Sequence, residues 1–387
     1  MVEDKQPPHQ KIWVDGCFDF THHGHTGALM QARQFGNELY VGVHSDEDIF
    51  ANKGPVVMSL DERIKSVDAC KWVTRSVPGA PYVTDPKVMD DWGCEYVVHG
   101  DDITTDADGN DCYQIVKDLG RFLVVKRTPN ISTTDLIQRM LSTSTAHHYA
   151  SLSAADSSHP LLQNAAVERM ASYATDETAL NPHSGVYAMI DGVALECLVP
   201  PSQVVEESLA KSAYYIDGSF DLFHVGHIEC LAAVHKRAQE DGAVVVVGIH
   251  DDETVNQGRG ENHPIMNIFE RTLCVLQCRY VDTVVVGAPF LPTPLFIELL
   301  DQKGIHITRV FHGHTDVITN HSALYNAVDP YLWAKEQSMY EQLPASNTSS
   351  LTTKNIVDRV LDHRRMYEER QRNKGVKAVN ERRMAGK

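Results

Sequence analysis

The sequence lacks several features that define common protein classes. Its longest apolar runs, such as residues 243–247, fall far short of the roughly 20 residues that cross a bilayer. The opening segment MVEDKQPPHQ has no apolar core of the kind found in signal peptides. Basic residues are scarce, with 35 Lys and Arg against 52 Asp and Glu and a formal net charge of −17. That charge argues against a non-specific nucleic-acid binder, which needs a basic face. We therefore expect a soluble, intracellular chain with no integral membrane segment and no nucleic-acid partner.

Cysteine is also sparse, with eight in 387 residues and no Cys-x-x-Cys pair. Such usage in a long chain is typical of a reducing compartment, and no cysteine pair has the spacing of a zinc site. The chain contains neither Gly-x-x-x-x-Gly-Lys-Ser/Thr nor Gly-x-Gly-x-x-Gly. The absence of both motifs weakens kinase and dehydrogenase alternatives. At about 150 residues per domain, the length indicates two or three domains.

The chain does contain one long internal repeat. Residues 12–25 read IWVDGCFDFTHHGH, and residues 214–227 read YYIDGSFDLFHVGH. The similarity continues in the same order through later blocks, for example residues 41–47 and 247–253. The offset between the copies grows along the chain, so insertions fall between the blocks, as loops permit. A long period with only two copies indicates a duplicated domain rather than a solenoid.

Each copy predicts strands that alternate with helices. Short apolar runs bounded by turn residues are typical of buried strands, and helical stretches separate them. The expected strands are residues 11–14, 39–43, 96–99 and 122–125 in the first copy and 214–216, 244–249, 283–286 and 305–311 in the second. Helices are expected, for example, over residues 26–34 and 60–71. This alternation predicts an α/β protein with two duplicated, doubly wound (Rossmann-like) parallel-sheet domains.

The segments outside the copies have a different composition. The predicted boundaries are 10–141 for the first domain, 142–211 for a partly ordered linker, 212–361 for the second domain and 362–387 for a basic tail. Ser, Ala and His are abundant at the start of the linker, so His147 and His148 are expected to be solvated. A solvated surface helix is the favoured interpretation of the tail over a membrane-surface element, because little apolar moment is visible past Met366.

The repeated His-x-Gly-His turn is the strongest candidate site. It follows a strand and opens a helix, and open α/β sheets bind ligands outside the carboxyl ends of their strands. A helix N-terminus offers free N–H groups and a partial positive charge to a phosphate. In the first copy His22 and His25 straddle Gly24, which lets the backbone approach a ligand closely. The turn therefore predicts stabilisation of a transferring phosphoryl or nucleotidyl group, with a turn of structural histidines or a metal site as alternatives.

These residues carry a family resemblance. The turn resembles that of the His-x-Gly-His nucleotidyltransferase superfamily. Residues 127–135, RTPNISTTD, are similar to the second signature of its cytidylyltransferase branch, Arg-Thr-x-Gly-Ile/Val-Ser-Thr. The tandem arrangement, together with segments such as KGPVV at 53–57, resembles the CTP:phosphoethanolamine cytidylyltransferases. A phosphocholine member would usually carry one catalytic domain and a long amphipathic membrane helix, and this sequence shows neither feature.

The resemblance implies transfer of CMP from CTP to phosphoethanolamine, with release of pyrophosphate, in phosphatidylethanolamine synthesis. It implies Mg²⁺ with the CTP, because the ion neutralises triphosphate charge. It also implies a cytoplasmic protein and allows peripheral association with the endoplasmic reticulum and a homodimer. A phosphocholine or other small-phosphate nucleotidyltransferase and a non-catalytic nucleotide-binding protein stay open. The head group does not follow from the residues, since an aromatic cage suits trimethylammonium and carboxylates suit a primary ammonium.

The resemblance also implies roles for individual residues. The implied catalytic residues are His22, His25, Lys53, Ser132 and Thr133, and the implied CTP-binding residues are Gly16, Cys17, Phe18, Gly24, Arg63, His99, Gly100, Asp101, Arg127 and Thr128. The nucleotide-binding residues implied for the second copy are Ser219, Phe220, His224, Gly226, His227, Arg259, His312, Gly313, Thr352 and Thr353. No metal ligand is implied.

Both copies depart from the family pattern. The first has Pro129-Asn130 where glycine is usual, and asparagine tolerates a left-handed backbone better than most residues. The second has Arg259 in place of the lysine, no Arg-Thr pair, and Leu351 in place of the serine. We expect the second copy to bind nucleotide weakly or to support the first rather than to catalyse well.

Overall fold

The computed structural model describes residues 9–129, 131–314, 329–345, 351–370 and 372. Asn130 and most of the predicted basic tail therefore lie outside the described residues. The chain divides into two compact units. The first comprises residues 1–141, 177–180 and 354–387, and the second comprises residues 142–176 and 181–353.

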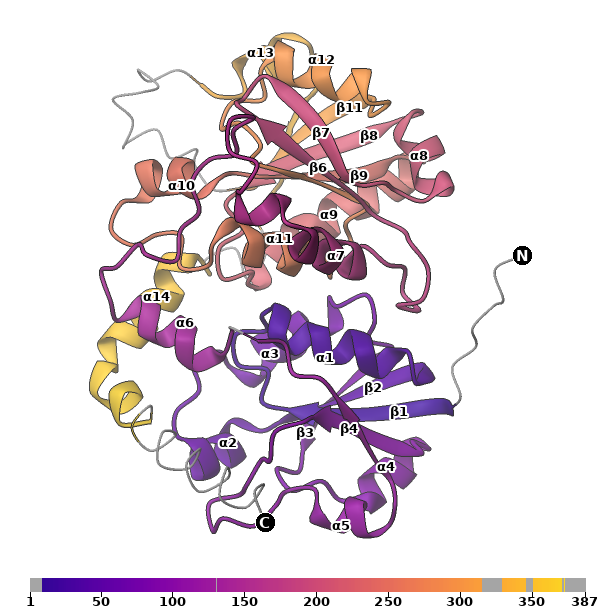
Figure 1. Ribbon diagram of the computed structural model, residues 1–387, viewed down its shortest axis with the longest axis vertical. Coiled ribbons are helices and arrows are strands. Elements are labelled where there is room, and N and C mark those ends of the chain that lie inside the picture. Colours follow the sequence, from indigo (N-terminus) through magenta and orange to yellow (C-terminus); the bar gives the residue numbers. More distant parts are fainter. Residues whose placement is uncertain (1–8, 130, 315–328, 346–350, 371, 373–387) are drawn as a thin grey trace. The chain divides into compact units, whose positions relative to one another are not determined.

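The first unit is a five-stranded sheet with helices on both faces (Figure 1). Its strands are β1 (His9–Gly16), β2 (Gly36–His44), β3 (Arg75–Ala80), β4 (Tyr96–Gly100) and β5 (Phe122–Val125). Its helices are α1 (His23–Arg33), α2 (Asp46–Lys53), α3 (Leu60–Asp68), α4 (Pro86–Trp92), α5 (Gln114–Asp118), α6 (Thr133–Met140) and, from its second residue on, α14 (Thr353–Asp362).

The strand order β3-β2-β1-β4-β5 makes this a doubly wound sheet, as predicted. Every pairing is parallel, and β1 lies at the centre. In Figure 1, α1 and α3 cover one face of the sheet, and α4 and α5 cover the other. The chain turns to opposite sides of β1 when it enters β2 and β4, so the carboxyl ends of β1 and β4 flank the point where ligands bind in such sheets.

Local signals explain most of these elements, and they also explain the differences from the prediction. Helix α1 begins at His23, three residues earlier than expected, because the His22 side chain caps it. The expected helix over residues 60–71 ends at Asp68. Strand β3 was not predicted, since it contains Pro78, which an edge strand can accommodate.

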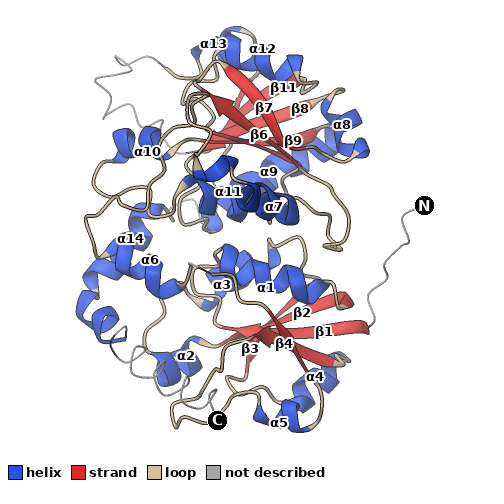
Figure 2. Cartoon of the chain, viewed as in Figure 1, coloured by secondary structure: helices blue, strands red, loops and turns tan. Residues whose placement is uncertain are grey.

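The second unit is a seven-stranded sheet (Figure 2). Its strands are β6 (Gly185–Ile190), β7 (Ala194–Val199), β8 (Ala213–Gly218), β9 (Val244–Ile249), β10 (Thr283–Val286), β11 (Ile307–His312) and β12 (Tyr340–Gln342). Its helices are the 3₁₀ helix η1 (Pro160–Leu162), α7 (Asn164–Tyr173), α8 (Gln203–Leu209), α9 (Val225–Asp241), α10 (Asp252–Arg259), α11 (Ile268–Leu276), α12 (Pro294–Gln302), α13 (Leu332–Glu336) and the first residue of α14.

The order β12-β11-β8-β9-β10-β6-β7 repeats the first sheet and extends it by a hairpin. Strands β8 to β12 correspond to β1, β2, β3, β4 and β5 in turn. Strand β6 pairs parallel with β10, whereas β7 is antiparallel to β6. The hairpin turns at Asp191-Gly192, both with positive φ, which is the Asp-Gly signal for a tight β-hairpin. Part of the segment predicted as a linker therefore belongs to the second sheet.

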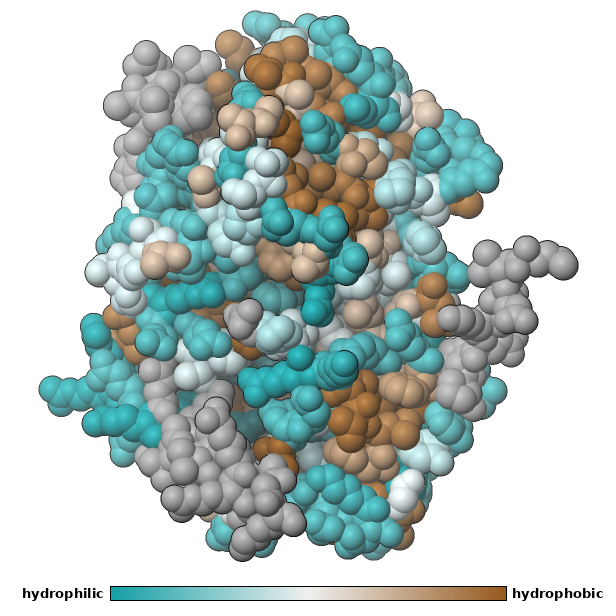
Figure 3. Space-filling model, viewed as in Figure 1, coloured by the Kyte–Doolittle hydropathy of each residue, from teal (hydrophilic) through white to brown (hydrophobic). Residues whose placement is uncertain are grey.

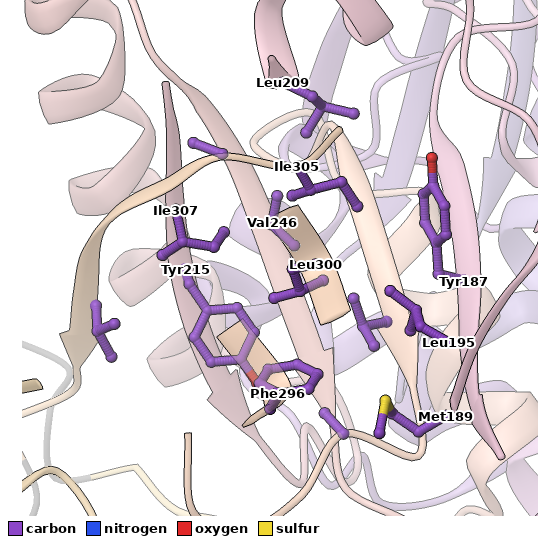
Figure 4. Close-up of a cluster of buried hydrophobic side chains, with 14 of the residues drawn as sticks. Tyr187, Met189, Leu195, Leu209, Tyr215, Val246, Phe296, Leu300, Ile305 and Ile307 are labelled. Carbon is purple, nitrogen blue, oxygen red and sulfur yellow. The ribbon is translucent and has the colours of Figure 1, made fainter. Parts of the chain in front are cut away.

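Apolar side chains pack on both sheets. In the first unit, buried Trp13, Met89 and Val97 belong to one cluster. In the second, Figure 4 shows the rings of Tyr215 and Phe296 side by side, with centroids 5.4 Å apart. The same cluster includes residues of the β6–β7 hairpin, so the hairpin adds to the core of its unit.

The surface is a mixture of polar and apolar residues (Figure 3). Large apolar side chains that stay exposed include Phe50, Val193, Val204 and Leu295. Among the residues that the structure describes, no helix combines the length and the apolar character needed to cross a membrane. All eight cysteines are among the described residues, and no disulfide bond is formed between them.

Candidate active site

The His-x-Gly-His turn of the first unit lies at the carboxyl end of β1. His22 is the N-cap of α1, and its Nδ1 accepts a hydrogen bond from the Gly24 amide at 3.0 Å. The rings of His22 and His25 are stacked, with centroids 4.0 Å apart. His22 is buried, whereas His25 is partly exposed. The helix start therefore brings two imidazoles together at a helix N-terminus, an arrangement suited to a phosphate.

The loop between β1 and α1 has an uncommon backbone conformation. Phe18 and Phe20 have φ values of 53° and 50°, in the left-handed region that bulky residues rarely adopt. Such residues cost on the order of 1–3 kcal/mol each and occur mostly where function requires them. Both side chains are buried, so packing holds the strained loop. The Gly16 position lies against the Phe18 ring, at 3.2 Å from where a Cβ would be.

Asp19 connects this loop to the loop that follows Lys53. Its Oδ1 accepts hydrogen bonds from the amides of Met58 at 3.0 Å and Val57 at 3.2 Å. Lys53 is the last residue of α2, and its Nζ lies 3.5 Å from Cys17 Sγ and 5.5 Å from the centre of the Tyr82 ring. The predicted lysine therefore reaches the carboxyl end of β1, where Cys17 follows the strand.

Arg63 fixes the backbone around the same site through hydrogen bonds. Its guanidinium donates to the carbonyls of Cys17 at 2.6 Å, His44 at 2.8 Å and Met58 at 3.2 Å, and to Asp46 Oδ1 at 2.6 Å. The side chain is buried. The donors of Arg63 are thus directed at the protein, and its contribution to the pocket is the shape of the loop.

The second signature, residues 127–135, contacts the loop before the His22 turn at the start of α6. Ser132 caps this helix by accepting from the Asp135 amide at 3.2 Å, and Thr133 Oγ1 donates to the Asp19 carbonyl at 2.9 Å. A Cβ on Gly24 would lie 2.7 Å from the His22 ring and 2.8 Å from Ile131. Gly24 is therefore required for the turn and the second signature to pack together.

The remaining predicted residues lie at the carboxyl ends of β4 and β5. The Arg127 guanidinium pairs with Asp102 at 2.9 Å, and its amide donates to Asp101 at 3.3 Å. Both side chains of the Arg127–Asp102 pair are about half exposed, so the arginine can exchange partners at low cost. Burial lowers the pKa of His99, which keeps its ring neutral near pH 7. Thr128 is buried and follows Arg127 directly.

One buried carboxylate beside the site was not predicted. Asp15 accepts hydrogen bonds from Trp13 Nε1 at 2.9 Å, Thr84 Oγ1 at 2.7 Å and the Tyr113 hydroxyl at 2.7 Å. The Tyr113 ring also lies against His99, with centroids 4.4 Å apart. A signal was available, because Asp111-Cys112-Tyr113 recurs as Asp329-Pro330-Tyr331 in the second copy.

The second unit repeats this backbone arrangement with different side chains. His224 caps α9 through the Gly226 amide at 3.1 Å, and its ring stacks on that of His227 with centroids 3.8 Å apart. Phe220 and Leu222 have positive φ, as Phe18 and Phe20 do. Burial lowers the pKa of His227 far below its ordinary value.

Other hydrogen bonds of the second unit correspond to hydrogen bonds at the site of the first. Arg271 donates to the carbonyls of Ser219 and Met266 and to Asp252, as Arg63 does to its partners. Thr353 Oγ1 donates to the Asp221 carbonyl at 3.0 Å, as Thr133 does to Asp19. The other predicted residues of this copy lie at the ends of elements. Helix α10 ends at Arg259, and β11 ends at His312 and is followed by Gly313. Thr352 directly precedes α14.

A magnesium site made of protein ligands alone does not fit these residues. In the described part of the chain, no group of three His, Cys, Asp or Glu side chains lies close enough to hold a metal ion. Mg²⁺ bound with a nucleotide takes most of its ligands from phosphates and water, with one or two carboxylates from the protein.

Comparison with known proteins places this geometry in a family. The cytidylyltransferase-like family model matches residues 13–139 and again residues 215–377. Ethanolamine-phosphate cytidylyltransferase of Dictyostelium discoideum is 40% identical over 96% of this chain and 96% of its own length. The chain belongs to the ethanolamine-phosphate cytidylyltransferase family. The mouse member is 39% identical over 95% of this chain and 90% of its own length.

Choline-phosphate cytidylyltransferase 2 of Arabidopsis thaliana resembles a smaller part of the chain. It is 41% identical, but over only 34% of this chain and 44% of its own length. The ethanolamine-phosphate cytidylyltransferase family therefore accounts for both copies of the repeat, whereas this choline-phosphate relative matches about one copy. The predicted tandem of cytidylyltransferase domains is confirmed.

Proposed function

We propose that this chain transfers CMP from CTP to phosphoethanolamine and that the first domain carries the reaction. The near full-length likeness to ethanolamine-phosphate cytidylyltransferases supports this most strongly. A phosphate oxygen of phosphoethanolamine attacks the α-phosphorus of CTP. The bond from that phosphorus to the oxygen bridging to the β-phosphate breaks, and pyrophosphate leaves. Such catalysis is mainly positioning and charge stabilisation.

His22 and His25 would donate hydrogen bonds to the oxygens of the crowded α-phosphorus. Lys53 would neutralise phosphate charge as a mobile ammonium at the end of α2. Arg127 would exchange Asp102 for the β- and γ-phosphates, and Ser132 and Thr133 would lie beside them at the start of α6. The CTP would bring Mg²⁺, which neutralises charge on the leaving pyrophosphate.

For the head group we propose Asp15 as the anionic partner of the primary ammonium. Its carboxylate is buried at the carboxyl half of β1 and is held by Thr84 and Tyr113. Three hydrogen bonds leave it one acceptor position, and a carboxylate is the group that a primary ammonium prefers. Trp13 and Tyr113 are aromatic, so phosphocholine is the competing acceptor to test.

The direct test is a set of substrate pairs. The full chain is given Mg²⁺ and either CTP or ATP, with phosphoethanolamine, phosphocholine or glycerol-3-phosphate, and pyrophosphate release is measured. We expect the highest kcat/KM with CTP and phosphoethanolamine. A higher value with phosphocholine or with ATP would reassign the substrate, and no release with any pair would favour a non-catalytic nucleotide-binding protein.

We also propose a cytoplasmic location, with peripheral association with the endoplasmic reticulum, and a homodimer. Cell fractionation tests the first two, and sedimentation of the purified chain tests the third. An integral membrane fraction or a monomer at micromolar concentration would contradict them.

A further inference from the structure

The loop that follows Lys53 is held by a second segment of the first unit, which we call the C-terminal strap and define as residues 359–370. Three successive carbonyls of the loop each accept a hydrogen bond from this strap. Arg370 Nη1 donates to Pro55 O at 2.5 Å, the Tyr367 hydroxyl donates to Val56 O at 2.9 Å, and Arg359 Nη1 donates to Val57 O at 3.2 Å. The contacts begin only two residues after Lys53.

Charge reinforces this docking at both ends of the strap. Arg359 forms a bidentate pair with Glu62, at 2.7 and 2.8 Å. Arg370 Nη1 also lies 3.4 Å from Asp19 Oδ2, and the exposed fractions of the two side chains are only 13% and 1%. Asp19 already accepts the amides of Val57 and Met58, so Arg370 closes a link from the His22 turn to the Lys53 loop.

The second unit holds its corresponding loop in a different way. Asp221 accepts the amides of Ile265 and Met266, as Asp19 accepts those of its own loop. His263 lies nearby, with its Nδ1 3.5 Å from Asp221 Oδ2. A histidine thus has the place beside Asp221 that Arg370 has beside Asp19.

Histidines also take the place of the strap. His147 Nε2 lies 2.8 Å from Pro264 O, and His148 Nε2 lies 2.9 Å from the same carbonyl. The expectation that these two histidines are solvated was wrong, since the second unit uses them to fix its loop. Arginines of the strap thus bind the loop that follows Lys53, whereas histidines bind the Pro264 carbonyl of the corresponding loop.

We propose that Arg370 is a positioning residue for Lys53, delivered by the C-terminal strap. It ties the Pro55 carbonyl to Asp19 and so fixes the lysine against the His22 turn. The inference rests on the proposed function, because it assigns Lys53 to the phosphates of CTP. Arg370 itself is not required to touch the substrate.

The test measures CTP affinity by calorimetry, together with kcat and both KM values, in the full chain. Arg370→Gln is expected to weaken CTP binding about 10- to 100-fold, as loss of a charge-assisted link would, and to leave the KM for phosphoethanolamine unchanged. Arg364→Gln is the matched control, since Arg364 lies in the same strap but is 55% exposed and pairs with Glu368. It should bind CTP as the wild type does.

A double-substitution cycle separates positioning from a merely structural role. If Arg370 acts through Lys53, Arg370→Gln should add little to the loss already caused by Lys53→Ala. Fully additive losses, or wild-type CTP affinity in the single variant, would overturn the proposal. Should Arg370→Gln fail to fold, Tyr367→Phe removes a single hydroxyl and is expected to weaken CTP binding about threefold; unchanged affinity there would equally overturn it. A wild-type chain that binds CTP but does not react with phosphoethanolamine would refute the proposed reaction and leave this test intact.

Discussion

The His22 turn of the first unit and the His224 turn of the second have the same backbone conformation but different surroundings. Both have two left-handed residues after the strand, a histidine cap, stacked imidazoles and a buried arginine that donates to at least two backbone carbonyls and to a carboxylate. Yet Lys53 corresponds to Arg259 in the second copy, and Thr84 corresponds to Pro292, which has no hydroxyl. The comparison teaches that the backbone of a site can persist after the side chains that touch a substrate have changed.

The buried carboxylates sharpen this contrast. Asp15 accepts three hydrogen bonds, from Trp13, Thr84 and Tyr113. Asp217, at the corresponding position of the second sheet, accepts a hydrogen bond from the Tyr331 hydroxyl at 2.6 Å and also interacts with the Tyr215 hydroxyl. Burial raises the pKa of Asp217 from 3.8 to about 7. The second unit therefore has a proton-binding group where the first has a hydrogen-bonded network.

The largest effect of a single substitution is expected at the cationic side chains that end α2 and α10. Lys53→Ala should lower kcat/KM for CTP by about 10²- to 10³-fold, because a preorganised charge at the phosphates is lost. Arg259→Ala should change it less than threefold. Pyrophosphate release measures both, and similar losses in the two variants would mean that both domains take part in the reaction.

A smaller effect is expected at the head-group pocket. Thr84→Val keeps the shape of the side chain but removes its hydrogen bond to Asp15. We expect the KM for phosphoethanolamine to rise about tenfold with kcat nearly unchanged. Steady-state kinetics with phosphoethanolamine as the varied substrate gives both constants. An unchanged KM together with a weaker CTP interaction would move the head group away from Asp15.

The next prediction concerns the dependence of stability on pH. Between about pH 4 and pH 7, Asp217 keeps its proton in the native protein but has lost it in the unfolded chain. The free energy of unfolding therefore falls as pH rises through this window. Asp217→Asn mimics the protonated form. Its Tm should match the wild type near pH 4 and exceed it by a few degrees at pH 7 and above.

The matched variant in the first unit is Asp15→Asn. Its amide nitrogen would face at least one of three donors, so its Tm should fall below that of the wild type. Thermal melts across this pH range decide both. A constant difference between Asp217→Asn and wild type would show that the Asp217 proton is not involved.

The smallest effect is expected at the residue that directly follows β1 in the first unit and β8 in the second. Cys17→Ser gives the first site the side chain of Ser219 while the backbone carbonyl still accepts from Arg63. Turnover should stay within about threefold of wild type, because the thiol contacts Lys53 only at 3.5 Å. A loss as large as that of Lys53→Ala would show that the thiol has a direct part in the reaction.

Some of this could be predicted from the sequence because the signals are local. The strands around the His22 turn, the turn itself and its second copy all follow from neighbouring residues and their repetition. Tyr113 could not be paired with Asp15, because 98 residues separate them and no local pattern joins them. Arg370 and Asp19 are 351 residues apart. The tail was expected to be a solvated surface helix because of its charge and its weak apolar moment, and neither property says which acidic group a basic residue will meet.

The central claim is that only the first of two matching turns carries the reaction. The most direct measurement compares two double variants, His22→Ala/His25→Ala and His224→Ala/His227→Ala, in one pyrophosphate-release assay with CTP and phosphoethanolamine. We predict that the second variant turns over about 10³-fold faster than the first and close to the wild type. Robust turnover by the His22→Ala/His25→Ala variant, with loss in the other, would contradict the claim and assign the reaction to the second domain.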